Sequence, residues 1–200
     1  MLVTGVLYQP KSFDHLLGLR GFSDQLLKNH FTLYQGYVNN TNKLLETLNI
    51  LLKESKTSAP EFAELKRRLG WEWNGMRLHE YYFGNMTKES SELDKGSELY
   101  RKIVEDFGSY ENWEKDFKGT GMMRGIGWVA LYYDPVAGRL FNTWINEHDV
   151  GHLSGATLIL IMDVFEHAFM IDYGLKRADY IEAFFKAIDW KTVAGRLVKP

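Results

Sequence analysis

An acidic side chain stands at the end of one of the most apolar stretches of the chain. Residues 156–163 read ATLILIMD, a short apolar run typical of a buried strand, and Asp163 closes it. Burying a carboxylate in such surroundings is unfavourable unless a cation or hydrogen-bond donors meet it there. His167 follows four residues later. The fold therefore has to bring compensating groups to the end of this strand.

Helical periodicity dominates the first part of the chain. Apolar residues recur at helical spacing across residues 23–54, and Ser23 is in the position of an N-cap. The length predicts one long helix, with a break expected near Gly36 or Asn39.

A second long helix follows a short turn. The segment SKTSAP ends at Pro60, a residue that favours the first turn of a helix, and helical spacing continues over residues 61–87. We expect an interruption between Gly70 and Gly75. The two helices are predicted to form an antiparallel hairpin, because the connection between them is short.

The second half mixes helices and strands. The polar segment TKESSELDKGS marks the boundary between an N-terminal helical-hairpin domain, residues 1–92, and a C-terminal α/β domain, residues 93–200. The expected elements are two short helices (97–106, 110–119), a β-hairpin around DPVAG (127–134, 138–145), a third strand (156–163) and a helical tail (165–172, 178–197). The predicted fold class is α+β, a long α-helical hairpin followed by an α/β domain with a small three-stranded antiparallel sheet.

Composition excludes several classes of function. The chain has no cysteine, which excludes disulfides, thiolate metal sites, iron–sulfur clusters and cysteine nucleophiles. A formal net charge of −2 gives no basic field for nucleic acid or an anionic membrane. We expect no signal peptide and no membrane span, since no apolar stretch approaches about 18 residues, and therefore a cytoplasmic protein.

Three of the six histidines lie in helical or apolar contexts: His30, His79 and His167. If the two long helices pack side by side, His30 and His79 meet across their interface, and Asp163 completes a cluster of three imidazoles and one carboxylate. Such donors suit Fe, Mn, Zn or Cu. A histidine on an apolar helix face is, however, more often a hydrogen-bonded core residue, and an Asp–His pair four apart is also common on helix surfaces. Spacing alone leaves both interpretations open.

A longer pattern resembles a known family. Residues 163–169, DVFEHAF, are similar to the metal-binding signature of the iron/manganese superoxide dismutases, D-x-[WF]-E-H-[STA]-[FY]-[FY], with Met170 in place of the last aromatic residue. Further family motifs are resembled, in the family's order, by YVNNTN (37–42), NGMRLHEYYFGNM (74–86), EDFGSYENWEKDF (105–117), GIGWVAL (125–131) and RADYIEAFFKAIDWKTV (177–193).

The resemblance implies the function and its ligands. It implies superoxide as the substrate, converted to O₂ and H₂O₂ by alternate reduction and oxidation of one Fe or Mn ion per chain. The metal would lie between the two domains, with His79, Asp163 and His167 as ligands. The fourth ligand is expected from the first helix, where the family places a histidine eight residues before the tyrosine that aligns with Tyr37. Eight residues back is Asn29 and seven is His30.

We expect His30 to be the fourth ligand. A spacing of seven keeps it on the face of Tyr37 in a regular helix, whereas a spacing of eight requires a local bulge of the π type. The neutral amide of Asn29 is also a poorer donor than imidazole. The first helix is therefore expected to be regular where the relatives bulge.

The resemblance implies roles beyond the ligands. His148 is in the place of the family's Gln or His that hydrogen-bonds the metal-bound solvent, and Gly75 is where some iron enzymes supply a Gln instead. Tyr37 matches the substrate-channel tyrosine, and Trp128 matches a tryptophan in the pocket wall, although plain core packing would explain it as well. Glu166 is in the place of a glutamate that reaches across a two-fold interface, which implies a homodimer.

One expected contact between subunits is altered. The family has two adjacent histidines in the first helix, one of them relaying to a tyrosine of the partner subunit. Here the corresponding positions read Tyr34 and Gln35, and Met170 replaces the tyrosine. We expect the access route to the site to be rebuilt. Two alternatives to a dismutase remain at this stage: a non-catalytic structural or interaction relative with the same fold, and a different metal oxidoreductase on the same scaffold.

Overall fold

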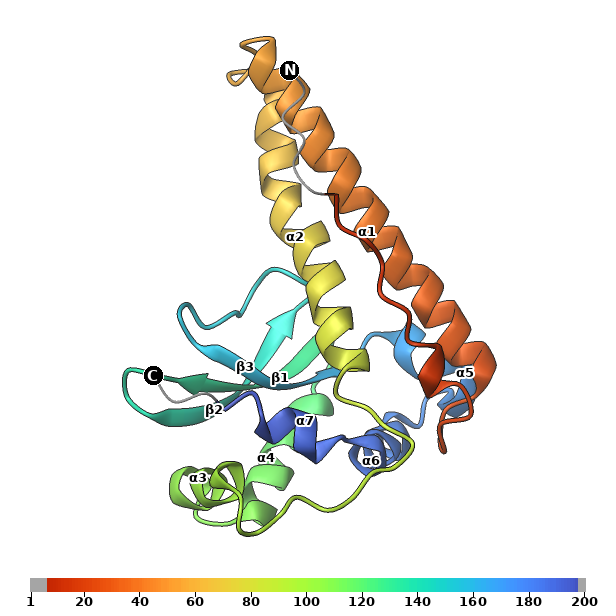
Figure 1. Ribbon diagram of the computed structural model, residues 1–200, viewed down its shortest axis with the longest axis vertical. Helices are drawn as coiled ribbons and strands as arrows, with labels where there is room; N and C mark the ends of the chain where they lie inside the picture. Colours follow the sequence, from red (N-terminus) through yellow and green to blue (C-terminus); the bar gives the residue numbers. More distant parts are fainter. Residues whose placement is uncertain (1–6, 198–200) are drawn as a thin grey trace.

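A computed structural model describes residues 7–197. A long helical hairpin projects from a body in which shorter helices pack beside a small sheet (Figure 1). In chain order the elements are η1 (Asp14–Leu16), α1 (Asp24–Lys53), α2 (Pro60–Phe83), α3 (Glu98–Phe107), α4 (Tyr110–Gly121), β1 (Gly127–Asp134), β2 (Arg139–Asn146), β3 (Thr157–Asp163), η2 (Glu166–Ala168), α5 (Met170–Tyr173), α6 (Arg177–Ala187) and α7 (Trp190–Ala194). The predicted α+β class, with its hairpin and three-stranded sheet, is confirmed.

The hairpin begins where the sequence predicts. The Ser23 side chain accepts a hydrogen bond from the backbone N–H of Leu26 at the start of α1, and Pro60 is the first residue of α2. Both helices are continuous, so the breaks predicted near Gly36 or Asn39 and between Gly70 and Gly75 were wrong. Packing of α1 against α2 outweighs the weak helix propensity of these residues.

The sheet has the strand order β2-β1-β3, and both pairings are antiparallel. The expected strands match the observed ones to within one residue. The central strand β1 is buried along almost its whole length, since β2 and β3 flank it and helices cover the sheet. Trp128 pairs with Asp163 across β1 and β3, so the register brings a buried indole beside the buried carboxylate.

The C-terminal tail differs from the sequence prediction. Residues 165–172 form a 3₁₀ turn and a short helix rather than one helix, and the segment predicted as a helix over 178–197 divides into α6 and α7. The division falls at Asp189, whose side chain caps α7 by accepting the backbone N–H of Thr192 at 3.1 Å. Its own backbone N–H donates to Asn85 O at 2.6 Å. A tertiary hydrogen bond therefore ends α6 where helical periodicity would continue.

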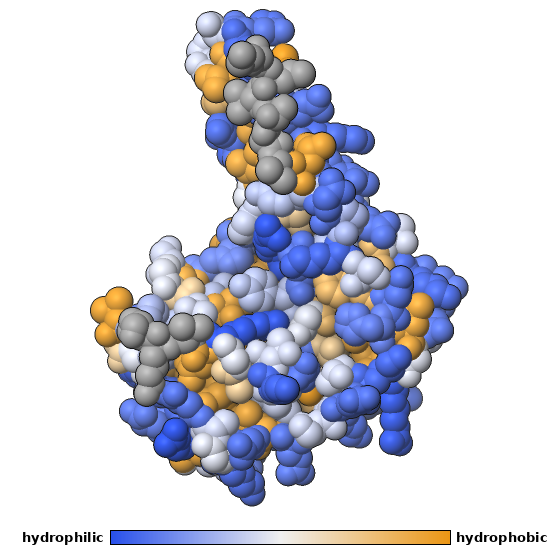
Figure 2. All heavy atoms as spheres, in the orientation of Figure 1, coloured by the Kyte–Doolittle hydropathy of each residue, from blue (hydrophilic) through white to orange (hydrophobic). Residues whose placement is uncertain are grey.

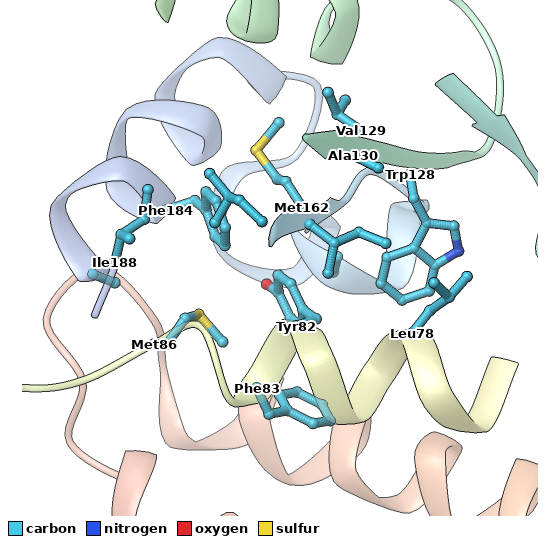
Figure 3. Close-up of a cluster of buried hydrophobic side chains, with 14 of the residues drawn as sticks. Leu78, Tyr82, Phe83, Met86, Trp128, Val129, Ala130, Met162, Phe184 and Ile188 are labelled. Carbon is cyan, nitrogen blue, oxygen red and sulfur yellow. The ribbon is translucent and has the colours of Figure 1, made fainter. Parts of the chain in front are cut away.

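One hydrophobic cluster joins the hairpin to the body. Figure 3 shows Leu78 and Tyr82 of α2 facing Trp128 of β1, with Met162 and Phe184 beside them. This packing fixes the inner end of α2 against the sheet, which positions the side chains described next. The domain boundary near residue 92 stays a prediction.

The surface carries separate apolar patches among polar side chains, as the face in Figure 2 shows. Within residues 7–197, no helix has both the length and the apolar character needed to cross a membrane.

Candidate functional site

Four side chains from four elements meet at the inner end of the hairpin. His30 comes from α1, His79 from α2, Asp163 from the end of β3 and His167 from η2, and one nitrogen or oxygen atom of each lies within 4.8 Å of those of the others. Asp163 Oδ2 is 3.2 Å from the Nε2 atoms of both His30 and His167, and 3.7 Å from His79 Nε2. His30, His79 and Asp163 are buried. The structure thus brings together the four residues predicted from the sequence.

The hydrogen bonding of His79 indicates what the cluster is built to hold. His79 Nδ1 lies 2.5 Å from the carbonyl oxygen of Gly75, and a carbonyl only accepts, so Nδ1 carries the proton. The lone pair of Nε2 then points toward Asp163 Oδ2, another acceptor, and Nε2 has no hydrogen-bond partner among the described residues. Two lone pairs facing each other in a buried site are unfavourable unless a cation lies between them. The donor set therefore fits a metal ion such as Fe, Mn or Zn.

Burial and the interactions among the four side chains set the protonation states of the cluster. Burial lowers the pKa of His30, and lowers that of His79 well below its usual range. Burial alone raises the pKa of Asp163, but His167 and His30 outweigh this effect and hold the pKa well below its usual range. Neutral imidazoles and an ionised carboxylate are the forms that bind metals.

Asp163 is held at two further points. Its Oδ1 accepts the backbone N–H of Phe165 at 2.8 Å, and its carbonyl oxygen accepts the hydroxyl of Tyr180 at 2.5 Å. The Tyr180 hydroxyl in turn lies 3.0 Å from that of Tyr82. These bonds fix the carboxylate and the strand end, leaving Oδ2 directed at the three histidines.

The first helix presents His30 rather than Asn29. Asn29 is exposed, and its side chain accepts a hydrogen bond from Gln25 at 2.8 Å. His30 is 1% exposed and belongs to the cluster. Helix α1 is α-helical throughout this region, and His30 and Tyr37 are both among its buried residues.

A second group of polar side chains adjoins the cluster. Trp128 Nε1 donates to His148 Nδ1 at 3.0 Å, and His148 Nε2 lies 2.7 Å from the hydroxyl of Tyr37. An indole N–H only donates, so Nδ1 is unprotonated and the neutral imidazole carries its proton on Nε2. His148 therefore donates to the Tyr37 oxygen, and the hydroxyl proton of Tyr37 remains available to another acceptor.

Burial controls the titration of this second group. Burial lowers the pKa of His148 to about 4, and burial raises the pKa of the Tyr37 hydroxyl. The Tyr37 ring stacks on His79 with ring centroids 5.2 Å apart. A Cβ atom on Gly75 would come within 2.6 Å of the Tyr37 ring, so glycine at this position is what allows the tyrosine its place.

The residues expected near the subunit contact lie in different surroundings. Tyr34 is buried, and its hydroxyl donates to Glu80 at 2.9 Å. Gln35 and Glu166 are exposed, and Met170 is 44% exposed. The adjacent side chains of Tyr34 and Gln35 therefore point in different directions, one into the protein and one toward solvent.

Sequence reasoning missed the role of Trp71. Its ring contacts His148 with centroids 4.6 Å apart and Tyr37 at 5.5 Å. The signal was present: Trp71, Gly75 and His79 are spaced four apart and so share one face of α2.

Comparisons of the sequence with known proteins all indicate the same family. Residues 94–196 match the family description "iron/manganese superoxide dismutases, C-terminal domain". A manganese superoxide dismutase of Haloferax volcanii is 38% identical over 87% of this chain and 86% of its own length. An iron superoxide dismutase of Cupriavidus metallidurans is 38% identical over 89% of each chain. One from Aquifex pyrophilus, also named for iron, is 35% identical over 96% of this chain and 91% of its own.

Proposed function

The chain belongs to the iron/manganese superoxide dismutase family, and from this premise we propose that it converts superoxide to O₂ and H₂O₂ with one bound Fe or Mn ion. The ligands we propose are His30, His79, Asp163 and His167. The observation that carries the assignment is the buried Nε2 of His79, which has no hydrogen-bond partner among the described residues and lies 3.7 Å from the carboxylate oxygen of Asp163.

The metal and the protein have separate tasks. A bound Fe or Mn ion supplies two oxidation states, so that one superoxide is oxidised to O₂ and the next is reduced, with two protons, to H₂O₂. The protein supplies one carboxylate and three neutral imidazoles, whose single negative charge would leave a bound divalent or trivalent ion with net positive charge and so attract an anionic substrate. Two ligands from the hairpin and two from the C-terminal half place this charge between the parts of the fold.

Proton supply is the task of the second group. His148 donates to the Tyr37 oxygen, so the Tyr37 hydroxyl proton stays available for donation to an acceptor other than His148. Because burial lowers the pKa of His148 to about 4, its imidazole stays neutral and keeps this hydrogen-bond direction at neutral pH. Trp128 fixes the tautomer that makes the arrangement directional.

The test measures metal and activity in the same sample. We expect purified protein to contain close to one Fe or Mn per chain by elemental mass spectrometry, and to consume superoxide in proportion to that metal. Protein without metal would favour a structural relative, and metal without superoxide consumption would favour a different oxidoreductase. Either result would overturn the proposal.

We also propose a homodimer with Glu166 at its interface. Glu166 is exposed and directly precedes His167, whose side chain is 29% exposed and thus reaches toward the surface. A carboxylate from a second subunit there would give the His167 ring an acceptor and fix its tautomer. Light scattering should show a dimer at micromolar concentration that weakens in Glu166→Ala. A monomeric wild-type protein would contradict this.

A further inference from the structure

His148 is covered on several sides by residues already described. Trp128 bonds its Nδ1 atom, Tyr37 accepts from its Nε2 atom, and the ring of Phe165 stacks on its face with centroids 4.9 Å apart at 25°. The ring of Trp71 contacts His148 in a T-shaped arrangement, with centroids 4.6 Å apart and an interplanar angle of 69°. Trp71 also contacts the Tyr37 ring. One indole therefore touches both partners of the His148–Tyr37 hydrogen bond.

Trp71 is itself held on both sides. Its Nε1 donates to Glu147 Oε2 at 3.0 Å, and the guanidinium of Arg68 lies 3.8 Å from the centre of its ring. Arg68 is oriented by Glu72, one helical turn along α2, through a 2.9 Å bond. The Arg68 side chain is 52% exposed, Trp71 is half-buried and His148 is buried. The order from solvent inward is thus Arg68, Trp71, His148.

The backbone at Glu147 supports a role for this arrangement. Glu147 adopts φ +47°, in the left-handed region that residues other than glycine rarely adopt. A strained backbone conformation of this kind persists only where the surrounding structure imposes it. Here the conformation places the Glu147 carboxylate on Trp71 and the next residue, His148, in the site.

We propose that Trp71 is a positioning residue for His148. Held by Arg68 and Glu147, its ring keeps water away from the His148–Tyr37 hydrogen bond and so preserves the tautomer and direction of that bond. The importance of this positioning for catalysis rests on the proposed function. The test of the proposal observes His148 directly, and so does not depend on turnover.

The experiment follows the ring N–H of His148 by nitrogen-15 NMR in full-length protein loaded with Zn²⁺, which is diamagnetic and accepts the same donors. The signal is assigned by its loss in His148→Gln. In wild type we expect protonation at Nε2 and slow exchange with solvent. Trp71→Ala should speed that exchange roughly tenfold. Absence of bound Zn²⁺ would count against the metal site alone, since the exchange of the His148 proton remains measurable.

A matched control is available on the same helix. Trp73 is two residues away, is 38% exposed, and donates to the Tyr8 hydroxyl rather than contacting His148. Trp73→Ala should leave the exchange unchanged. Unchanged exchange in Trp71→Ala, or equal acceleration in both variants, would overturn the proposal.

A second variant tests the same proposal with a substitution that is not expected to destabilise the fold. Glu147→Gly removes the acceptor of the Trp71 indole and also relieves the positive φ, so the free energy of unfolding should not fall. Exchange at His148 should still accelerate. If this variant is folded and His148 exchanges as in wild type, Trp71 does not depend on Glu147 in the way proposed.

Discussion

Tyr34 and Tyr37 lie one turn apart on α1, and both are buried against His79, yet their surroundings are opposite. The ring centroids are 6.4 Å and 5.2 Å from that of His79. Tyr37 bonds to the neutral imidazole of His148; we call Tyr37, Trp128 and His148 the neutral flank. Tyr34 bonds to a carboxylate on the other side.

The second side is built from charges. The Tyr34 hydroxyl donates to Glu80 Oε1 and accepts the backbone N–H of Lys11 at 3.0 Å. Glu80 Oε2 lies 2.6 Å from Arg77 Nη1 and 3.0 Å from Lys11 Nζ. We call Lys11, Tyr34, Arg77 and Glu80 the ion-paired flank. It joins the segment before α1 to the hairpin, whereas the neutral flank serves the site. The same residue type thus has a structural role on one side and a chemical role on the other.

The largest expected effect is on the ion-paired flank. Glu80→Ala removes the acceptor of Tyr34 and leaves Arg77 and Lys11 without their shared carboxylate. We expect the free energy of unfolding in urea to fall by about 3 kcal/mol, with metal content retained. Glu64→Ala, at an exposed glutamate on the same helix, should leave the free energy of unfolding nearly unchanged, because its ion pair with Arg67 lies in solvent. Similar losses in the two variants, or loss of metal in Glu80→Ala, would remove the contrast between the flanks.

The next effect is a pH dependence on the neutral flank. The folded pKa of His148, about 4, lies below the ordinary value of 6.5, so unfolding takes up a proton between these values. Its contribution to stability is complete above pH 6.5 and falls as pH drops toward 4. Between pH 7.5 and pH 5 the loss should be about 2 kcal/mol.

Chemical unfolding of metal-free protein at several pH values measures this loss. His30 and His79 also have lowered pKa values and contribute in the same direction, so the comparison must be with His148→Gln. In that variant, the free energy of unfolding should depend less steeply on pH, because about one proton fewer is taken up on unfolding. Equal slopes would show that His148 does not titrate as its burial implies.

The smallest effects separate the two tyrosines. Tyr34→Phe should lower the free energy of unfolding by about 1 kcal/mol and leave superoxide consumption per bound metal unchanged. Tyr37→Phe should reduce that consumption several-fold, because it removes the hydroxyl proton and the acceptor for His148. Stopped-flow measurement of superoxide decay would record both. If Tyr34→Phe lowers activity as much as Tyr37→Phe, the ion-paired flank also takes part in the chemistry.

Much of the fold and of the candidate site could be predicted from the sequence, and the parts that could not be predicted have physical causes. The apolar run ending at Asp163 predicted a buried strand, and the helical contexts of His30 and His79 predicted their meeting. The glycines of α1 and α2 were misleading because local propensity is weak beside tertiary packing. Gly75 in particular supports the site by its missing side chain, which no helix rule indicates.

Tertiary partners explain what the sequence did not predict. Asp189 interrupts the tail through a bond to Asn85, about a hundred residues away in the chain. Tyr34 was interpreted only by its alignment to a relay position, and the ion-paired flank depends on Lys11 and Glu80, which no motif connects to it. Spacing patterns describe one element at a time, so contacts that no family motif covers, such as those of Lys11 and Glu80 with Tyr34, were beyond them.

The central claim, that His30 completes a metal site with His79, Asp163 and His167, is tested most directly by bound metal. His30→Ala and Asn29→Ala alter adjacent residues of α1, one in the cluster and one exposed. Elemental analysis of both purified variants should show metal lost from His30→Ala and retained at wild-type level in Asn29→Ala. Metal retained in His30→Ala and lost from Asn29→Ala would contradict the account.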